Sequence, residues 1–204
     1  MNKMALSHIG LRKILGWLGL ALPVLCVIGG WLAGQSGNSI SAYYGTNMRD
    51  LFVGVLFLTG FFMITYKGYD KKDDIITTIG GVASIVTAFF PCCSSELSIW
   101  MLPDSISSLF HLVGAITLFA SFGFMSYFQF TKTDGNMTDQ KKKRNVIYRT
   151  CGIVIAAMIL YTPLGAFWID HTYGLSTILV VETIMLVAFA ISWFTKGEAL
   201  LKDK

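Results

Sequence analysis

Charged side chains are scarce in this sequence. They make up 14% of its 204 residues, whereas hydrophobic residues make up 54%. A soluble domain carries about 25% charged residues, so this composition excludes an ordinary water-soluble domain and predicts an integral membrane protein. The net charge of +4 belongs to basic residues in short loops beside apolar segments, where contacts to anionic lipid headgroups are expected. We therefore expect membrane lipids as partners and no nucleic acid.

Cysteine and histidine are also rare, with 4 and 3 residues respectively. Cys26 and Cys151 lie inside apolar segments, where small packing roles are predicted. The sequence has no C-x-x-C, H-x-x-x-H or H-E-x-x-H motif, and such spacings are typical of zinc sites. We expect neither a metal nor another cofactor.

Long apolar stretches dominate the chain instead, and a helix of about 20 residues suffices to cross a bilayer. Alternation of period two is absent, so these stretches are expected to be helices, whose backbone groups are all paired internally. The sequence predicts an all-α bundle of six transmembrane helices that forms a single domain over residues 1–204. The expected spans are 13–33, 48–67, 75–91, 106–130, 146–168 and 174–195.

Basic residues are almost missing from one side of this pattern. Of the 16 Lys and Arg residues, only Arg49 falls in a connection on that side, and the others gather in residues 3–13, 67–72, 132–149 and 196–204. The positive-inside rule then predicts that both termini are cytoplasmic. A bacterial inner membrane is the expected location.

Glu182 is the most unusual residue, because it lies about two turns inside the last expected span. An ionisable group at the centre of a span costs about 2.5–3.5 kcal/mol on insertion scales, so it marks a functional hypothesis by default. His111 lies inside the fourth span and Asp50 begins the second, both near the same outer side. We predict that Asp50, His111 and Glu182 are the catalytic residues of a polar pocket that faces outward.

The outer connection before the second span is rich in hydroxyl groups and glycine, with the sequence G-Q-S-G-N-S-I-S-A-Y-Y-G-T-N-M. We expect Ser41, Tyr43 and Tyr44 to line the mouth of the pocket. Arg49 is expected to bind an anionic headgroup. These four residues are the predicted ligand-binding set.

Each ionisable residue also has a purely structural interpretation. Asp50 favours the positive end of a helix dipole, His111 suits a membrane interface, and Glu182 could accept a hydrogen bond from a neighbouring helix. Both interpretations remain open at this point.

Small residues at four-residue spacing form two stripes, Gly80 with Ser84 and Ala88, and Gly30 with Gly34. Such stripes let helices approach closely in lipid. We interpret both as packing faces within the chain, and a homo-oligomer built on these faces is the alternative.

Four stretches resemble those of uncharacterised bacterial multi-span membrane proteins: 39–54, 66–70, 142–152 and 182–198. More distantly, the hydroxyl-rich outer loop with a histidine and carboxylates at one leaflet is similar to the Frag/DRAM group and to the ceramidase-like (CREST) membrane hydrolases. Those hydrolases use a Ser, an Asp and several His for zinc. The paired C-terminal histidines of that pattern are missing here.

The function predicted from these features is the binding or modification of a lipid or amphiphile in the outward-facing pocket, with lipid hydrolysis as one form. Whether the protein is an enzyme is left open. Two alternatives remain: a small proton-coupled transporter or channel that uses Glu182, and an accessory or assembly subunit of a membrane complex.

Overall fold

The computed structural model describes residues 8–92, 102–133, 135–168 and 176–202. Over these ranges the chain is helical and contains no strand, which confirms the all-α prediction. Each predicted segment contains one long helix. The elements are α1 (His8–Leu32), η1 (Ser41–Gly45), α2 (Arg49–Thr65), α3 (Lys71–Phe89), α4 (Asp104–Phe124), η3 (Met125–Gln129), α5 (Asp139–Trp168) and α6 (Thr177–Lys196).

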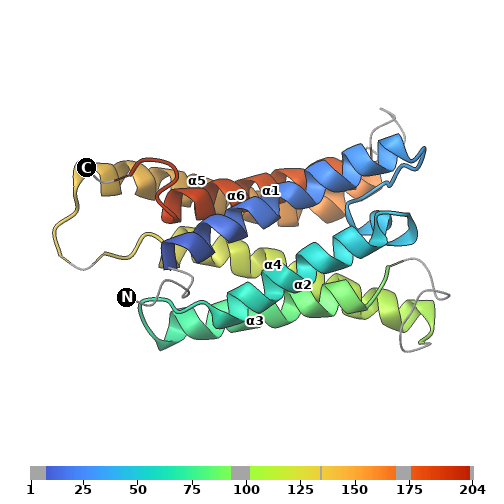
Figure 1. Cartoon of the computed structure of the whole chain (residues 1–204), viewed down its shortest axis with the longest axis horizontal. Coiled ribbons are helices and arrows are strands. Elements are labelled where there is room, and N and C mark those ends of the chain that lie inside the picture. Colours follow the sequence, from blue (N-terminus) through green and yellow to red (C-terminus); the bar gives the residue numbers. More distant parts are fainter. Residues whose placement is uncertain (1–7, 93–101, 134, 169–175, 203–204) are drawn as a thin grey trace, which may run out of the picture.

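The long helices form a ring in chain order, with α1, α5 and α6 in one layer and α2, α3 and α4 in the other (Figure 1). Each helix packs on the next one, and α6 closes the ring against α1. The start of α1 therefore meets the end of α6, where Arg12 Nη1 donates to the carbonyl oxygen of Lys196 at 3.5 Å. We call this the basic end of the ring, and the opposite one the Glu182 end.

Four helices are long and apolar enough to cross a bilayer: α1, α4 continued by η3, α5 as far as Pro163, and α6. These helices indicate a membrane-embedded protein. Helices α2 and α3 do not belong to this set, for one reason each. α2 has 17 residues, which reach about 26 Å at 1.5 Å per residue, and α3 begins with the charged run K-K-D-D.

Side chains are distributed as expected for a lipid environment. Large apolar residues point outward and are more than half exposed, among them Trp17, Leu109, Val146, Ile153 and Leu160. Small hydroxyl residues point inward and bond to their own helix, as Thr59 Oγ1 does by donating to the Val55 oxygen at 2.8 Å. Their polar groups are thus satisfied without water, which a bilayer core requires.

The stripe of small residues on α3 is a packing face within the chain, as predicted. Ser84 Oγ donates to the carbonyl oxygen of Leu56 on α2 at 2.8 Å, and Ala88 is completely buried. A side chain at Gly80 would collide with Met63. The stripe lets α2 and α3 approach closely.

The prediction of a second packing stripe is correct for Gly30 and wrong for Gly34. Gly30 does pack, against the ring of Tyr43, but a Cβ at Gly34 would meet nothing within 4 Å. Gly34 has a φ of 67° and ends α1, because Gln35 N donates to the Gly30 oxygen at 2.8 Å and Gly34 N to the Trp31 oxygen at 3.1 Å. These two bonds form the Schellman motif that usually takes glycine.

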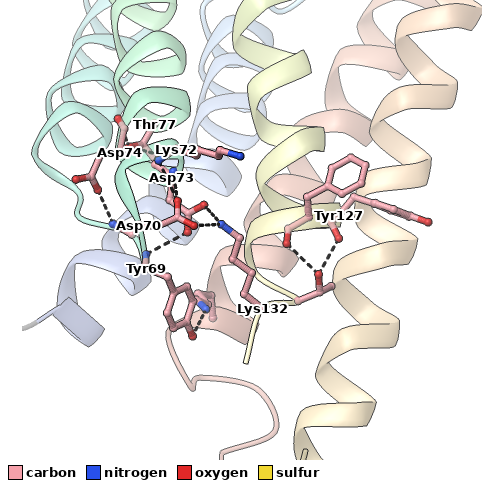
Figure 2. Close-up of polar contacts among 12 residues, drawn as sticks. Tyr69, Asp70, Lys72, Asp73, Asp74, Thr77, Tyr127 and Lys132 are labelled. Atoms are coloured by element: carbon pink, nitrogen blue, oxygen red, sulfur yellow. Dashed lines mark hydrogen bonds and ion pairs between the residues drawn. The ribbon is translucent and has the colours of Figure 1, made fainter. Parts of the chain in front are cut away.

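At the basic end, α3 is tied to the segment that follows η3 (Figure 2). Asp70 caps α3, with Oδ1 accepting from the Lys72 and Asp73 amides at 2.9 and 3.1 Å. Lys132 Nζ donates to Asp70 Oδ2 at 2.9 Å and also to Asp73. The bond from Lys132 lowers the pKa of Asp70, and the bond to Asp73 raises the pKa of Lys132.

Candidate functional site

Glu182 lies in the second turn of α6, where its carboxyl group meets the connection between α1 and α2. Oε2 accepts a hydrogen bond from the Ile40 amide at 2.5 Å. Oε1 lies 3.3 Å from Ser41 Oγ. The carboxyl group therefore fixes the start of η1 against α6.

His111 approaches the same hydroxyl group from α4. Its side chain is only 4% exposed, and Nε2 lies 2.9 Å from Ser41 Oγ. Nδ1 lies 2.7 Å from the carbonyl oxygen of Phe90. A carbonyl oxygen can only accept, so Nδ1 carries a proton and donates it to Phe90. Ser41 thus stands between an imidazole and a carboxyl group.

Ser41 has a single hydroxyl proton, and this limits the protonation states available to the hydrogen-bonded cluster of Glu182, Ser41 and His111. If it points to His111, Nε2 is an acceptor and a protonated Glu182 donates to Ser41. If it points to Glu182, the carboxylate is ionised and a cationic His111 donates to Ser41. Both arrangements share one proton between Glu182 and His111, and they interconvert when protons shift through Ser41.

The surroundings of this cluster are apolar and tightly packed. A cavity of about 20 Å³ touches Ser41 and Glu182, which is room for about one water molecule. Its apolar lining residues include Leu22, Phe52, Leu56, Leu118, Phe119 and Leu186. The low dielectric of such a site strengthens the hydrogen bonds inside it.

Asp50 is placed apart from the other two predicted catalytic residues. Its side chain is 94% exposed and pairs with the neighbouring Arg49, with Nε and Oδ1 3.5 Å apart. In the first turn of α2 it suits the positive end of the helix dipole. The structure brings together Ser41, His111 and Glu182, and leaves Asp50 outside this cluster.

Arg49 and Asp50 instead border a groove of about 540 Å³ on the outside of α2 and α3. The guanidinium carbon of Arg49 lies 6.0 Å from the centre of the Tyr44 ring. Tyr44 has a raised phenol pKa because burial disfavours its charged form. The groove is lined by Tyr44, Arg49, Asp50, Val53, Gly54, Phe57, Ala88 and Phe89.

Tyr43 lines neither space. It is 3% exposed and packs on the backbone of Gly30 and Gly37, so its role is to hold the connection against α1. Two partners of the cluster, the Ile40 amide and the Phe90 carbonyl, were not predicted. Backbone groups carry no residue signature, so no pattern could have found them.

The geometry at Ser41 is that of a hydroxyl nucleophile with its base. The 2.9 Å distance between Oγ and Nε2 lies within the hydrogen-bond reach of about 2.6–3.2 Å required of such a pair. In a Ser-His-Asp triad a carboxylate orients the histidine, whereas here the Phe90 carbonyl does so and the carboxyl group of Glu182 contacts Ser41 itself.

Within the described ranges, no three His, Cys, Asp or Glu side chains are grouped so as to hold a metal ion. Comparison with known proteins finds no matching family model, curated protein or solved structure.

Proposed function

We propose that the protein is a six-span inner-membrane protein that binds an amphiphile in the groove at Arg49 and acts on it with the Ser41 hydroxyl. The observation that carries this proposal is the position of Ser41 Oγ, 2.9 Å from His111 Nε2 and 3.3 Å from Glu182 Oε1. In this proposal α2 and α3 also cross the membrane, both termini are cytoplasmic and Ser41 faces the outer side. The support is that α2 and α3 complete the ring formed with the four apolar helices.

The groove has the properties of an amphiphile site. Arg49 stands at one end with its side chain 45% exposed, so it can bind a phosphate or carboxylate headgroup. The remaining lining, which includes Val53, Phe57 and Phe89, is apolar and suits an acyl chain. Clefts of about 300–1,000 Å³ with few polar groups are typical of small-molecule sites.

The chemical step would be acyl transfer. Ser41 Oγ attacks an ester or amide carbonyl of the bound amphiphile while His111 Nε2 takes the hydroxyl proton, then returns it to the leaving group. A water molecule, for which the small cavity has room, hydrolyses the acyl-serine with His111 again as base. The Phe90 carbonyl, which accepts from Nδ1, stabilises the imidazolium that forms.

Phe52 controls access to Ser41 in this mechanism. Its side chain is 2% exposed and lines the small cavity, whereas the next residue, Val53, lines the groove. α2 is therefore the wall between the two spaces. A substrate carbonyl reaches Ser41 only when the Phe52 side chain moves aside.

A fluorophosphonate probe tests the reactive hydroxyl directly. The full chain in nanodiscs is treated with the probe, and labelling is located by peptide mass spectrometry. We expect labelling of Ser41 that Ser41→Ala and His111→Gln abolish. Ser39→Ala is the matched control, because Ser39 Oγ only accepts from the Ala42 amide at 2.9 Å, and it should be labelled like the wild type. Absence of labelling in the wild type would refute the reactive role.

A proton pathway through the protein is the competing function, and the packing below Glu182 opposes it. The rings of Phe122 and Phe189 stack with centroids 3.7 Å apart. Leu186 lies between them and Glu182 on the buried face of α6. The nearest buried hydroxyl further along α6 is that of Ser192, whose Oγ lies 2.8 Å from Ser126 Oγ in η3. The apolar layer separates this pair from the cluster.

A further inference from the structure

Charged residues gather at the basic end, around a cavity of about 280 Å³. Five of its lining residues are Lys or Arg and one is acidic. The cavity is formed by residues from α1, α5, α6 and the segments beside them: Arg12, Tyr69, Lys132, Thr133, Asn136, Thr138, Lys141, Arg144, Tyr148, Lys196 and Glu198. None of these residues belongs to the Ser41 cluster.

Lys196 is buried there with only neutral partners. It is 7% exposed, its Nζ donates to Tyr69 Oη at 3.0 Å, and the same Nζ lies 4.5 Å from the Tyr69 ring centre. Across the described chain, no ion pair is formed by Lys196 or Arg12. A buried cation is costly unless it is paired.

Membrane topology does not explain this burial. A lysine at the end of a span normally extends its ammonium group to water, and orientation signals work when they are exposed in loops. Lys196 instead folds inward, between the rings of Tyr69 and Phe130. This placement keeps the ammonium group of Lys196 beside the cavity.

Arg12 provides a second, independent observation. Its Nε is buried and has no hydrogen-bond partner within the described chain, while its guanidinium carbon lies 5.7 Å from the centre of the Tyr66 ring. Gln129, Gln140 and Asn145 also carry buried polar atoms without a partner there, and all three lie in η3 or the first turns of α5. Buried polar groups are nearly always hydrogen-bonded. Of these four residues Arg12 lines the cavity and the other three do not, so the Arg12 Nε is the group that a ligand in the cavity can satisfy.

Carboxylates neutralise one of the cavity cations, Lys132. Asp70 and Asp73 both accept from it (Figure 2), and neither aspartate lines the cavity. Arg12 and Lys196, which form no ion pair among the described residues, project a positive potential into a small space. The hydroxyl groups of Thr133, Thr138 and Tyr148 add neutral donors.

We propose that this cavity binds a phosphate group. Phosphate offers three acceptor oxygens and up to two negative charges, which matches a set of arginine, lysine and hydroxyl donors better than a carboxylate with one charge does. The volume is close to the lower end of small-molecule sites, about 300 Å³, so a headgroup or a small soluble phosphate fits. The site stands at the opposite end from Ser41 and does not depend on the proposed reaction there.

Binding to the full chain distinguishes the two sources. In detergent, the melting temperature is measured against inorganic pyrophosphate. In nanodiscs, it is compared between membranes with phosphatidic acid and membranes of phosphatidylcholine alone. A rise with pyrophosphate identifies a soluble phosphate, and a rise only with phosphatidic acid identifies a lipid headgroup. If neither ligand raises the melting temperature, the proposal is wrong.

Single substitutions locate the effect in the cavity. We expect Arg12→Gln, Arg144→Gln and Lys196→Met each to weaken binding about tenfold or more, the loss expected for one charge-assisted contact. Lys143→Gln is the matched control, because Lys143 belongs to the same run on α5 but is exposed and does not line the cavity. Equal losses in Lys143→Gln and Arg144→Gln would show diffuse charge attraction and overturn the proposal. Arg12→Gln keeps the test decisive if Lys196→Met fails to fold.

Discussion

Replacing Glu182 by glutamine or by alanine separates the two possible protonation arrangements at Ser41. Glutamine keeps an oxygen for the Ile40 amide, which now bonds to Glu182 at 2.5 Å, and its NH₂ group donates to Ser41 Oγ as a protonated carboxyl group does. Alanine leaves the Ile40 amide without an acceptor at a residue that is 2% exposed. The two variants therefore test the same site with and without its hydrogen bonds.

The expected cost follows from the bonds that each variant loses. An unsatisfied buried donor costs about 1–3 kcal/mol, and the lost contact to Ser41 adds about 0.5–1.5 kcal/mol. Glu182→Ala should therefore destabilise the protein by about 2–4 kcal/mol. Since about 1 kcal/mol shifts the melting temperature of a 150–250-residue protein by about 2–4 °C, we expect a decrease of about 4–16 °C. Glu182→Gln should stay within about 1 kcal/mol of the wild type.

Thermal unfolding of the purified protein in detergent, followed by circular dichroism, measures these shifts. Thr183→Ala is the control on the same helix, because Thr183 Oγ1 bonds only to the Leu179 oxygen of α6 at 2.7 Å. If Glu182→Gln is as destabilised as Glu182→Ala, the carboxylate is ionised and its charge matters, which refutes the neutral arrangement. If Glu182→Ala matches Thr183→Ala, the chain of hydrogen bonds does not stabilise the fold.

Three further predictions concern other parts of the molecule. Gly80→Ala should destabilise the protein by about 1–3 kcal/mol through overpacking, because the new Cβ meets the Cβ of Ser121 at 2.8 Å as well as the end of Met63. Gly54→Ala, with open space around it, should not destabilise, and chemical denaturation compares the pair. The hydrogen bond from Lys132 lowers the pKa of Asp70 from its ordinary 3.8. The stabilisation from this contact is therefore complete above that value and is lost as the pH falls through the lowered pKa. When unfolding is measured at several acidic pH values, Lys132→Met should lose less stability than the wild type. Phe52→Ala should increase fluorophosphonate labelling of Ser41 if α2 is the wall of the site, and unchanged or reduced labelling of folded protein would contradict this.

The positions of the helices were largely predictable because apolar length is a strong signal. Cys26 and Cys151 are buried as predicted. The helix bounds were less accurate where charged residues continue a helix beyond its apolar part. α5 begins at Asp139, seven residues before the expected span at 146, since hydropathy detects the segment that lipid can surround and a helix extends as far as its hydrogen bonds do.

The sequence predicted the depth of the candidate-site residues in the helix bundle, but not whether their side chains point into it. The distance of a residue from the end of its span sets its height in the ring, and His111 and Glu182 do lie at one level and share Ser41. Which face of a helix points inward depends on packing with its neighbours. Asp50, at the start of α2, points outward, and one sequence contains no signal for that rotation.

The buried face of α6 explains why the two ends of the protein differ. Glu182 and Lys196 stand fourteen residues apart on it, about 21 Å at 1.5 Å per residue, with Leu186, Phe189 and Trp193 packed between them. They are too far apart to neutralise each other directly, so each needs local partners. Glu182 has the Ile40 amide, Ser41 and, through it, His111. Among the described residues, Lys196 contacts the hydroxyl group and ring of Tyr69 and the ring of Phe130 and forms no ion pair. A phosphate in the cavity beside it would supply the missing negative charge.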